Sequence, residues 1–322
     1  MDLRDYLIRT SIVQTEYGRS ATVEEDATVR HAIGVMRKRK VGCQLATRGG
    51  ILCGILTERD LIRKVFGPGR SLDVPVHEVM TRKPVVAGTN EPLYRVLSRM
   101  YCGGFRHVPV VGEVGEALGT VSLPRVADLI ADSFVGKFLS KPLPPYERGV
   151  LEFADESYDN REEAETRESR APELVPRSVD APEDRPTEGL GSEPLSALRP
   201  KPAVFVARDA SVAHAVDTMN RLDIGCVLVG SDEDVAGIFS ERDLLFGIGE
   251  TYEGVKQRSV EEFMTTEPEM LDADTLLLHV LGRMAAGGFR HVSVTREKRV
   301  VGVVSLRDLL GLVNKWYPDL VG

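Results

Sequence analysis

The sequence has few cysteines, no long apolar run and no excess of positive charge. Its four cysteines, Cys43, Cys53, Cys102 and Cys226, are scattered and form no CxxC pair, which argues against a disulfide framework. No run approaches the roughly 18–20 apolar residues of a membrane span, and the charged N-terminus lacks the apolar core of a signal peptide. A net charge of −8 argues against a protein that binds nucleic acid or anionic membranes through its overall charge. We therefore expect a cytoplasmic protein without membrane segments.

Residues 147–194 contain no lysine, and no aromatic residue lies between Asp159 and Val204. The segment has 15 acidic residues and 6 arginines, so it carries a net charge of −9 and leaves the rest of the chain almost neutral. Such a composition buries too little apolar surface to offset the entropy of ordering it. We expect residues 141–195 to form a flexible acidic linker, which serves either as a plain tether or as a docking or phosphorylation segment.

The segments on either side of this linker duplicate each other, and internal repeats are a strong signal of fold. TERD at 57–60 recurs as SERD at 240–243, GGFRH at 103–107 recurs unchanged at 287–291, and HEVMT at 77–81 is echoed by EEFMT at 261–265. Each half also contains two weaker copies, visible as apolar stripes with the i, i+3, i+4, i+7 spacing of a helix. The four stripes are Val29, Ala32, Ile33 and Met36; Leu93, Val96, Leu97 and Met100; Val212, Ala215, Val216 and Met219; and Leu277, Val280, Leu281 and Met284.

We interpret the methionines of these stripes as core residues. The stripes begin just after residue types that commonly cap helices, so we expect the N-caps to be Asp26, Asn90, Asp209 and Asp274. After each helix come a glycine-containing break, a short β-rich run, a second run ending in Ser or Thr, and another apolar helix. The predicted units cover residues 18–75, 76–140, 196–259 and 260–322, after a helical lead-in at 1–17. One unit of roughly 55 residues is marginally stable, so we expect the units to pair within each half.

Together these motifs resemble the cystathionine-β-synthase (CBS) domain family. The resemblance rests on the lead-ins Met80-Thr81 and Met264-Thr265, the four stripes and the [Ser/Thr]-x-x-Asp turns. It implies an α/β (α+β) fold of four β-α-β-β-α CBS repeats, paired into two Bateman modules. It also implies similarity to the adenine-nucleotide-sensing γ subunit of AMP-activated protein kinase.

Each [Ser/Thr]-x-x-Asp turn lies where a strand leads into a helix, so free backbone N–H groups and a hydroxyl there suit a phosphate or a ribose. The carboxylate accepts hydrogen bonds, and the resemblance implies that it holds ribose hydroxyls while neighbouring strands enclose adenine. The alternative is a helix cap without a ligand. The candidate residues are Thr57, Asp60, Ser240, Asp243, Ser305 and Asp308.

The second unit departs from this pattern, because Ser122 is followed by Arg125 where the other turns have aspartate. A guanidinium has only donors and cannot accept from a ribose. We expect this degenerate site either to lack a nucleoside or to offer the Arg125 charge to a phosphate in a neighbouring cleft.

The even units carry a basic pair at the start of their middle strand, Arg106-His107 and Arg290-His291. The pair resembles the phosphate-binding pair of the kinase γ subunit, with a bidentate arginine and a histidine of pH-tunable charge. The alternative is a structural arginine that pairs with a carboxylate across a repeat interface. Cys43 and Cys226 begin apolar strands and are expected to be core thiols.

The leading hypothesis is a non-enzymatic sensor that binds AMP, ADP, ATP, NAD or S-adenosylmethionine between paired repeats. It needs no cofactor or resident metal, although a nucleotide could bring Mg²⁺. The two modules face each other within one chain as a four-repeat disc or pair across a homodimer. Ligand binding then shifts the arrangement seen by an effector protein. The alternatives are an adaptor with vestigial pockets and an unrecognised enzyme, while nucleic acid is an unlikely partner because no basic stripe is evident.

Overall fold

The computed structural model describes residues 3–15, 17, 20–135 and 191–317, which contain four similar α/β units. We call these units repeats one to four. Repeat one comprises β1 (Thr22–Glu24), α2 (Val29–Lys38), β2 (Cys43–Arg48), β3 (Ile51–Thr57), α3 (Glu58–Leu61) and the π-helical turn η2 (Ile62–Phe66). Repeat two comprises β5 (Ala87–Gly88), α4 (Leu93–Gly103), β6 (His107–Val111), β7 (Ala117–Ser122), α5 (Leu123–Ile130) and η4 (Ala131–Val135).

The second half has the same order of elements. Repeat three comprises β8 (Phe205–Val206), α7 (Val212–Leu222), β9 (Cys226–Gly230), β10 (Val235–Ser240), α8 (Glu241–Asp243), η6 (Leu244–Ile248), η7 (Gly249–Thr251) and α9 (Tyr252–Val255). Repeat four comprises β12 (Met270–Asp272), α10 (Leu277–Gly287), β13 (His291–Arg296), β14 (Arg299–Ser305) and α11 (Leu306–Trp316).

Each repeat builds its own small sheet around the first strand of its hairpin. In repeat one, β2 pairs in parallel with β1 and antiparallel with β3, and the corresponding strands of the other repeats pair in the same way. The helix between the first two strands provides the crossover that a parallel pair requires. Two short strands, β4 (Thr81–Arg82) and β11 (Thr265–Thr266), extend the sheets of repeats one and three. The predicted β-α-β-β-α fold is confirmed.

The four long helices carry the apolar stripes. Their N-cap positions lie two residues after those that the sequence analysis predicted. The hydroxyl of Thr28 accepts a hydrogen bond from His31 N, and that of Ser211 accepts one from His214 N, so these residues cap α2 and α7. At α4 and α10 the N-cap positions are Pro92 and Leu276, which make no side-chain cap bond.

The predicted caps were therefore wrong, because these residues lie in the turn between strand and helix. In repeat one, the turn closes through a hydrogen bond from Ala27 N to Glu24 O, and Ala210 N bonds to Ala207 O in the same way in repeat three. The residues that lie two positions before the observed caps are Asp26, Asn90, Asp209 and Asp274. Asp and Asn favour such turns as well as caps, so residue type alone could not decide between them.

Helices from the two halves pack against each other and form two shared cores. Repeats one and three share one core, in which Ile33 and Leu61 belong to the same cluster as Val216 and Leu245. Repeats two and four share the other, which includes Val96 and Leu281. The stripe methionines are buried, as predicted: Met36, Met100, Met219 and Met284.

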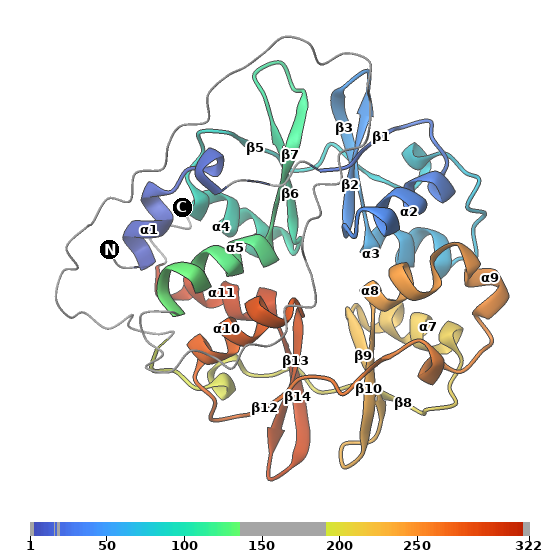
Figure 1. The fold of residues 1–322 in the computed structure, drawn as a ribbon, viewed down its shortest axis with the longest axis vertical. Helices are drawn as coiled ribbons and strands as arrows, with labels where there is room; N and C mark the ends of the chain where they lie inside the picture. The colour runs from blue at the N-terminus through green and yellow to red at the C-terminus, as the bar shows by residue number, and fades with distance from the viewer. Residues whose placement is uncertain (1–2, 16, 18–19, 136–190, 318–322) are drawn as a thin grey trace.

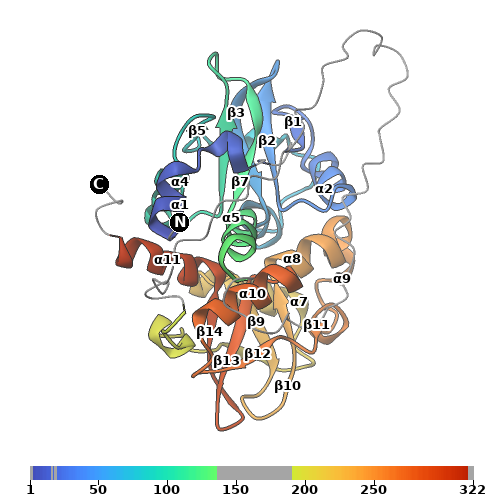
Figure 2. The ribbon, with the colours of Figure 1, turned by 60° about the vertical axis from the view of Figure 1, so that its left-hand side comes forward.

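Seen along the shortest axis, the four sheets lie toward the outside and the helices fill a band between the two halves (Figure 1). The view turned by 60° shows the same two tiers, with the helices of both halves meeting between the upper and lower sheets (Figure 2). The two modules thus face each other within one chain, which is the four-repeat disc.

The ends of the described segments belong to this disc. The helix α1 (Leu3–Arg9) and the turn η1 (Ile12–Thr15) place Leu3, Leu7 and Ile12 in the core of repeats two and four. Leu195, at the start of η5 (Leu195–Leu198), is buried in the same core, and Leu277 N donates to Glu193 O at 3.0 Å. The last residues assigned to the linker are therefore packed against repeat four, and residues 141–190 of the predicted linker lie outside the described residues.

Candidate functional site

The three [Ser/Thr]-x-x-Asp turns share one geometry at the start of the helix that ends each hairpin. In repeat one, Thr57 N and Oγ1 donate to Asp60 Oδ2 at 3.0 and 2.6 Å, and Asp60 N donates back to Thr57 Oγ1 at 3.2 Å. The same three bonds join Ser240 to Asp243 and Ser305 to Asp308. Each turn is a capping box, which stabilises the helix start without any ligand.

These bonds change the expected role of the turn. The N–H groups of Thr57 and Asp60 are used within the turn, and Glu58 N donates to Gly42 O. The expectation that exposed N–H groups of this helix start receive a phosphate is therefore not supported in repeat one. What each turn still offers is the second carboxylate oxygen of its aspartate.

The second oxygen differs among the three aspartates. Asp60 Oδ1 accepts from Thr81 Oγ1 at 2.9 Å and pairs with Lys64 Nζ at 2.7 Å. Asp243 Oδ1 accepts from Thr265 Oγ1 at 2.7 Å. Among the described residues, Asp308 Oδ1 has only Lys201 Nζ, at 3.6 Å and thus beyond normal hydrogen-bond distance. Asp308 therefore has the most capacity to accept from a ligand hydroxyl.

The degenerate turn of repeat two keeps the cap and loses the acceptor. Ser122 Oγ accepts from Arg125 N at 3.3 Å, which places Arg125 at the position of the aspartates. Arg125 Nε donates to Thr15 O at 3.2 Å, so this side chain fastens the N-terminal segment. Neither Ser122 nor Arg125 lines the two clefts described below.

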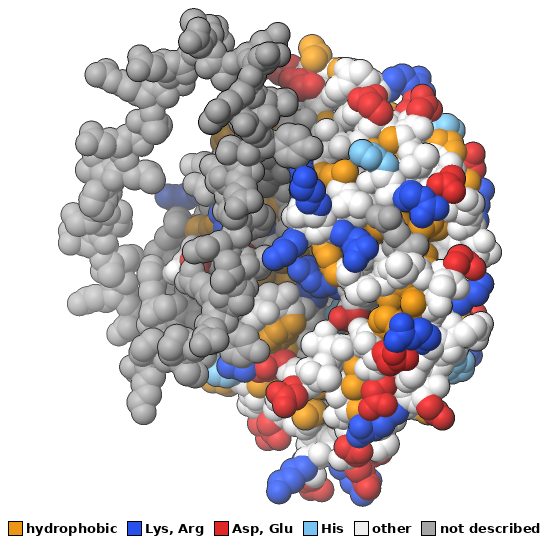
Figure 3. Space-filling model, turned by 45° about the vertical axis from the view of Figure 1, so that its right-hand side comes forward, with side chains coloured by type: hydrophobic (Ala, Val, Ile, Leu, Met, Phe, Trp, Pro, Cys, Tyr) orange, Lys and Arg blue, Asp and Glu red, His pale blue; other side chains and the backbone are white. Residues whose placement is uncertain are grey.

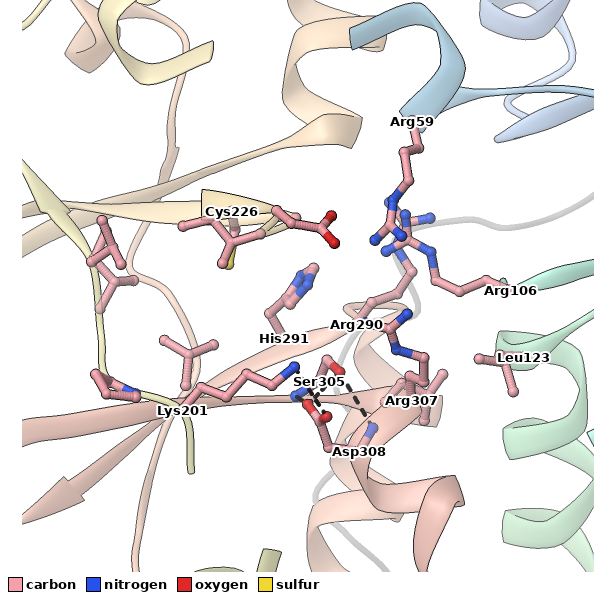
Figure 4. A pocket seen from close by; sticks show the side chains of 18 of the residues that line it. Arg59, Arg106, Leu123, Lys201, Cys226, Arg290, His291, Ser305, Arg307 and Asp308 are labelled. Carbon is pink, nitrogen blue, oxygen red and sulfur yellow. Dashed lines mark hydrogen bonds and ion pairs between the residues drawn. The ribbon is translucent and has the colours of Figure 1, made fainter. Parts of the chain in front are cut away.

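The main cleft lies in the second module and opens onto the Asp308 turn. The space between its walls, part of which is open solvent, is about 780 Å³. Figure 4 shows Lys201 and Asp308 on one side of the cleft, with Ser305 beside them. Apolar side chains of repeats three and four form the wall: Val204, Ile224, Leu228 and Val303.

The other end of the main cleft is basic and contains residues of both modules. Arg59 and Arg106 come from the first module and Arg290 from the second, and the three side chains converge above His291 (Figure 4). Arg307 also lines the cleft and donates to Gly104 O at 2.7 Å across the modules. The cleft thus has an acceptor and apolar walls at one end and guanidinium groups at the other.

A second cleft lies in the first module beside the Asp60 turn, and the space within it, part of which is open solvent, is about 1170 Å³. It contains Thr57, Asp60 and His107, and it shares Arg59 and Arg106 with the main cleft. Ser240 and Asp243 line neither cleft. On the face shown in Figure 3, lysine and arginine side chains gather near the middle of the described surface, whereas the lower rim mixes both signs of charge.

The basic end is neutralised in part by buried glutamates from the opposite module. Arg290 donates to Glu58 Oε2 at 2.7 Å, with side chains only 9% and 1% exposed. Arg106 pairs with Glu241, which also accepts from Arg59 Nε at 3.2 Å. The alternative interpretation of Arg106 and Arg290, a structural pair with a carboxylate across an interface, is thus what the structure contains.

The histidines of the two basic pairs are neutral in this structure. Burial, together with Arg106 and Arg290, lowers the pKa of both His107 and His291 to about 3. The expectation that they contribute pH-tunable charge near neutrality was wrong, because desolvation and two neighbouring cations disfavour the imidazolium. Each neutral imidazole can still donate or accept a hydrogen bond in the cleft that it lines.

The thiols of Cys43 and Cys226 are buried, and burial raises the pKa of each to about 12, so the prediction of core thiols is confirmed. Within the described residues, His, Cys, Asp and Glu form no group of three that could hold a metal ion.

Sequence reasoning missed several residues of the main cleft. It assigned no role to Arg59, or to Glu58 and Glu241, which hold arginines of the cleft without lining it, although all three belong to the duplicated tetrapeptides. Duplication alone could not reveal their pairing, because Glu241 and Arg106 are 135 positions apart. Lys201 precedes the first strand of repeat three in a segment without a recognisable motif, so nothing in the sequence pointed to it.

The CBS domain family model matches residues 5–67, 76–132, 196–250 and 260–315, which are the four repeats. The chain belongs to the CBS domain family. Among the curated relatives of this CBS protein is CBS domain-containing protein CBSCBSPB1 of Arabidopsis thaliana, which is 26% identical over 303 residues, covering 92% of this chain and 52% of that protein. The chain thus spans about half the length of this relative.

A second relative matches a smaller part of the CBS chain. CBS domain-containing protein YhcV of Bacillus subtilis is 30% identical over 118 residues, covering 37% of this chain and 84% of that protein. Among solved structures, protein MJ1225 of Methanocaldococcus jannaschii superposes with a TM-score of 0.67 at 13% identity, covering 97% of this chain and all of that one. This likeness shows that the whole four-repeat fold is shared. No helix in the described part of the chain combines the length and apolarity needed to cross a membrane.

Proposed function

We propose that this CBS protein is a non-enzymatic regulator that binds an adenine nucleotide or another adenosyl ligand in the main cleft. The observation that carries the proposal is the second carboxylate oxygen of Asp308, whose one contact among the described residues is a 3.6 Å ion pair with Lys201, in a cleft with apolar walls and a basic end. A ribose with two hydroxyls needs an acceptor, a purine needs an apolar slot, and an anionic tail needs guanidinium donors. The main cleft offers all three in one place.

The degenerate Arg125 turn has no such acceptor, and Asp60 and Asp243 have theirs occupied. We therefore expect the Asp308 site to be filled at the lowest ligand concentration. The description of MJ1225 relates it to the γ subunit of AMP-activated protein kinase, which agrees with a sensor role. Binding would act by stabilising one arrangement of the modules that an effector protein recognises.

Calorimetric titration with adenosine, AMP and S-adenosylmethionine tests this function. Replacing Asp308→Ala removes a charged acceptor and should weaken binding by about ten- to a hundredfold, the equivalent of roughly 1.5–3 kcal/mol. The matched control is Asp209→Ala, because Asp209 is exposed and lines neither cleft. If none of these compounds binds the wild-type protein, the sensor function is wrong, and an adaptor that acts through protein contacts remains.

A further inference from the structure

Three of the four arginines that line the main cleft are held by carboxylates of the protein itself, whereas Arg307 donates to a backbone carbonyl. Glu241 binds Arg106 and Arg59, and Glu58 binds Arg290. Both glutamates are the first residues of short helices, α8 and α3, and their side chains are 4% and 1% exposed. The two carboxylates thus stand directly behind the guanidinium groups that a ligand tail would meet.

The two glutamates compensate most of the charge of the three arginines that they hold, and Arg307 adds a further positive charge to the cleft. Three guanidinium groups face two carboxylates, which leaves one uncompensated positive charge among these five residues. Burial tends to raise the pKa of Glu241, but Arg106 and Arg59 outweigh it and lower the pKa to about 2, so this carboxylate stays ionised. Each guanidinium has five N–H donors, and the glutamates use only some of them.

We propose that Glu58 and Glu241 restrict the ligand tail, so that the main cleft selects an adenosyl ligand with one phosphate over a di- or triphosphate. This inference rests on the proposed function and names the ligand class of the same site. A single phosphate can bind the donors that the glutamates leave free. A triphosphate brings about two further negative charges, which must either lie beside the two carboxylates or displace them from their arginines.

Displacement is unfavourable because it leaves a carboxylate buried without its partner. Glu58 already has one oxygen, Oε1, that is buried and has no hydrogen-bond partner. Within the described part of the chain, its second oxygen accepts from Arg290 at 2.7 Å. A ligand that withdraws Arg290 would therefore leave the whole carboxylate unsatisfied. The cost rises with the number of phosphates that need these arginines.

The test compares adenosine, AMP and ATP by calorimetry in the presence of EDTA, so that no divalent cation masks the phosphate charge. In the wild-type protein, AMP should bind at least tenfold more tightly than ATP. In Glu241→Gln the side chain keeps its shape and loses its charge, so the AMP-to-ATP ratio of affinities should fall at least fivefold. Adenosine has no tail, and its affinity should not change.

Glu58→Gln should shift the ratio in the same direction, which keeps the test valid if Glu241→Gln does not fold, as judged by circular dichroism. The matched control is Glu233→Gln, which also removes a glutamate paired with an arginine, Arg299, but lines neither cleft. If adenosine and AMP bind but ATP binds wild type as tightly as AMP, or both cleft variants keep the wild-type ratio, this inference is wrong and the proposed function stands. If none of the three binds, both fail.

Discussion

At the basic end of the main cleft, two of the arginines could be predicted from the sequence but their carboxylate partners could not. Sequence reasoning found Arg106 and Arg290 from their identical pentapeptides, but their partners lie in the opposite module, 135 and 232 positions away. A pattern along one chain cannot specify a contact that depends on how two modules face each other. The same limit applies to His107 and His291, whose neutrality follows mainly from burial and also from Arg106 and Arg290, two arginines that the fold brings together from different modules.

The buried histidines predict how stability depends on pH. Each has a pKa of about 3 in the folded protein and near 6.5 when unfolded. Below pH 6.5 the unfolded chain takes up protons that the folded protein does not, so the free energy of unfolding falls as the pH falls. Between pH 7.5 and 5.5, urea unfolding should show a loss of about 1 kcal/mol per histidine relative to a His107→Gln, His291→Gln double variant.

The double variant is needed as a reference because Asp128 acts in the opposite direction. Burial raises the pKa of Asp128 to about 6, so the stability linked to its protonation is lost as the pH rises through that value. This contribution is the same in both proteins and cancels in the difference. Equal pH dependence in the two proteins would contradict neutral burial of the histidines.

Whole elements were predicted more reliably than their ends. A stripe of four apolar residues averages over a helix, so the four long helices and the buried methionines followed from periodicity. At α2 and α7 a single side-chain hydrogen bond caps the start of the helix. Thr28 and Ser211 accept these bonds, and the acidic residues two positions earlier do not. The sequence likewise could not show whether a [Ser/Thr]-x-x-Asp turn is a capping box or a ligand-binding turn. Both uses require Ser or Thr with Asp three residues later.

The revised caps predict different costs for neighbouring substitutions. Ser211→Ala removes the acceptor for His214 N and should lower the free energy of unfolding by about 1 kcal/mol. Asp209→Ala should cost clearly less, because Asp209 is exposed and precedes the cap. Urea denaturation of both variants at pH 7.5 measures the difference. If Asp209→Ala lowered the free energy of unfolding more than Ser211→Ala, Asp209 would be the N-cap, as predicted from the sequence.

At the scale of the whole molecule, the two halves are one folding unit because each shared core contains helices of both. Phe66 packs against Tyr252 with ring centroids 5.0 Å apart, and Asn220 Nδ2 donates to Ile62 O at 3.3 Å. The sequence predicted four repeats but left open whether the modules meet within one chain. Only the arrangement of cores decides that question.

This arrangement predicts that the chain stays assembled after it is cut. A protease site inserted between residues 141 and 190 and then cleaved should leave the two fragments co-eluting near 35 kDa in size-exclusion chromatography with light scattering. The apolar surface of two shared cores would hold them together. The uncleaved insertion protein is the control. Separate elution of the fragments at micromolar concentration would show that the connection, and not the packing, joins the halves.

The reciprocal ion pairs have a consequence for the history of this chain. Each half supplies one glutamate and one arginine, so Glu58–Arg290 and Glu241–Arg106 are the same bond made twice. A single half would carry both groups, and two identical copies could satisfy each other around a twofold axis. When the two copies are joined in one gene, the symmetric arrangement is kept, but the sequences of the two halves can diverge. Asp308 and Arg125 then mark where two once equivalent turns became different, one able to accept a ribose and the other fastening a terminus.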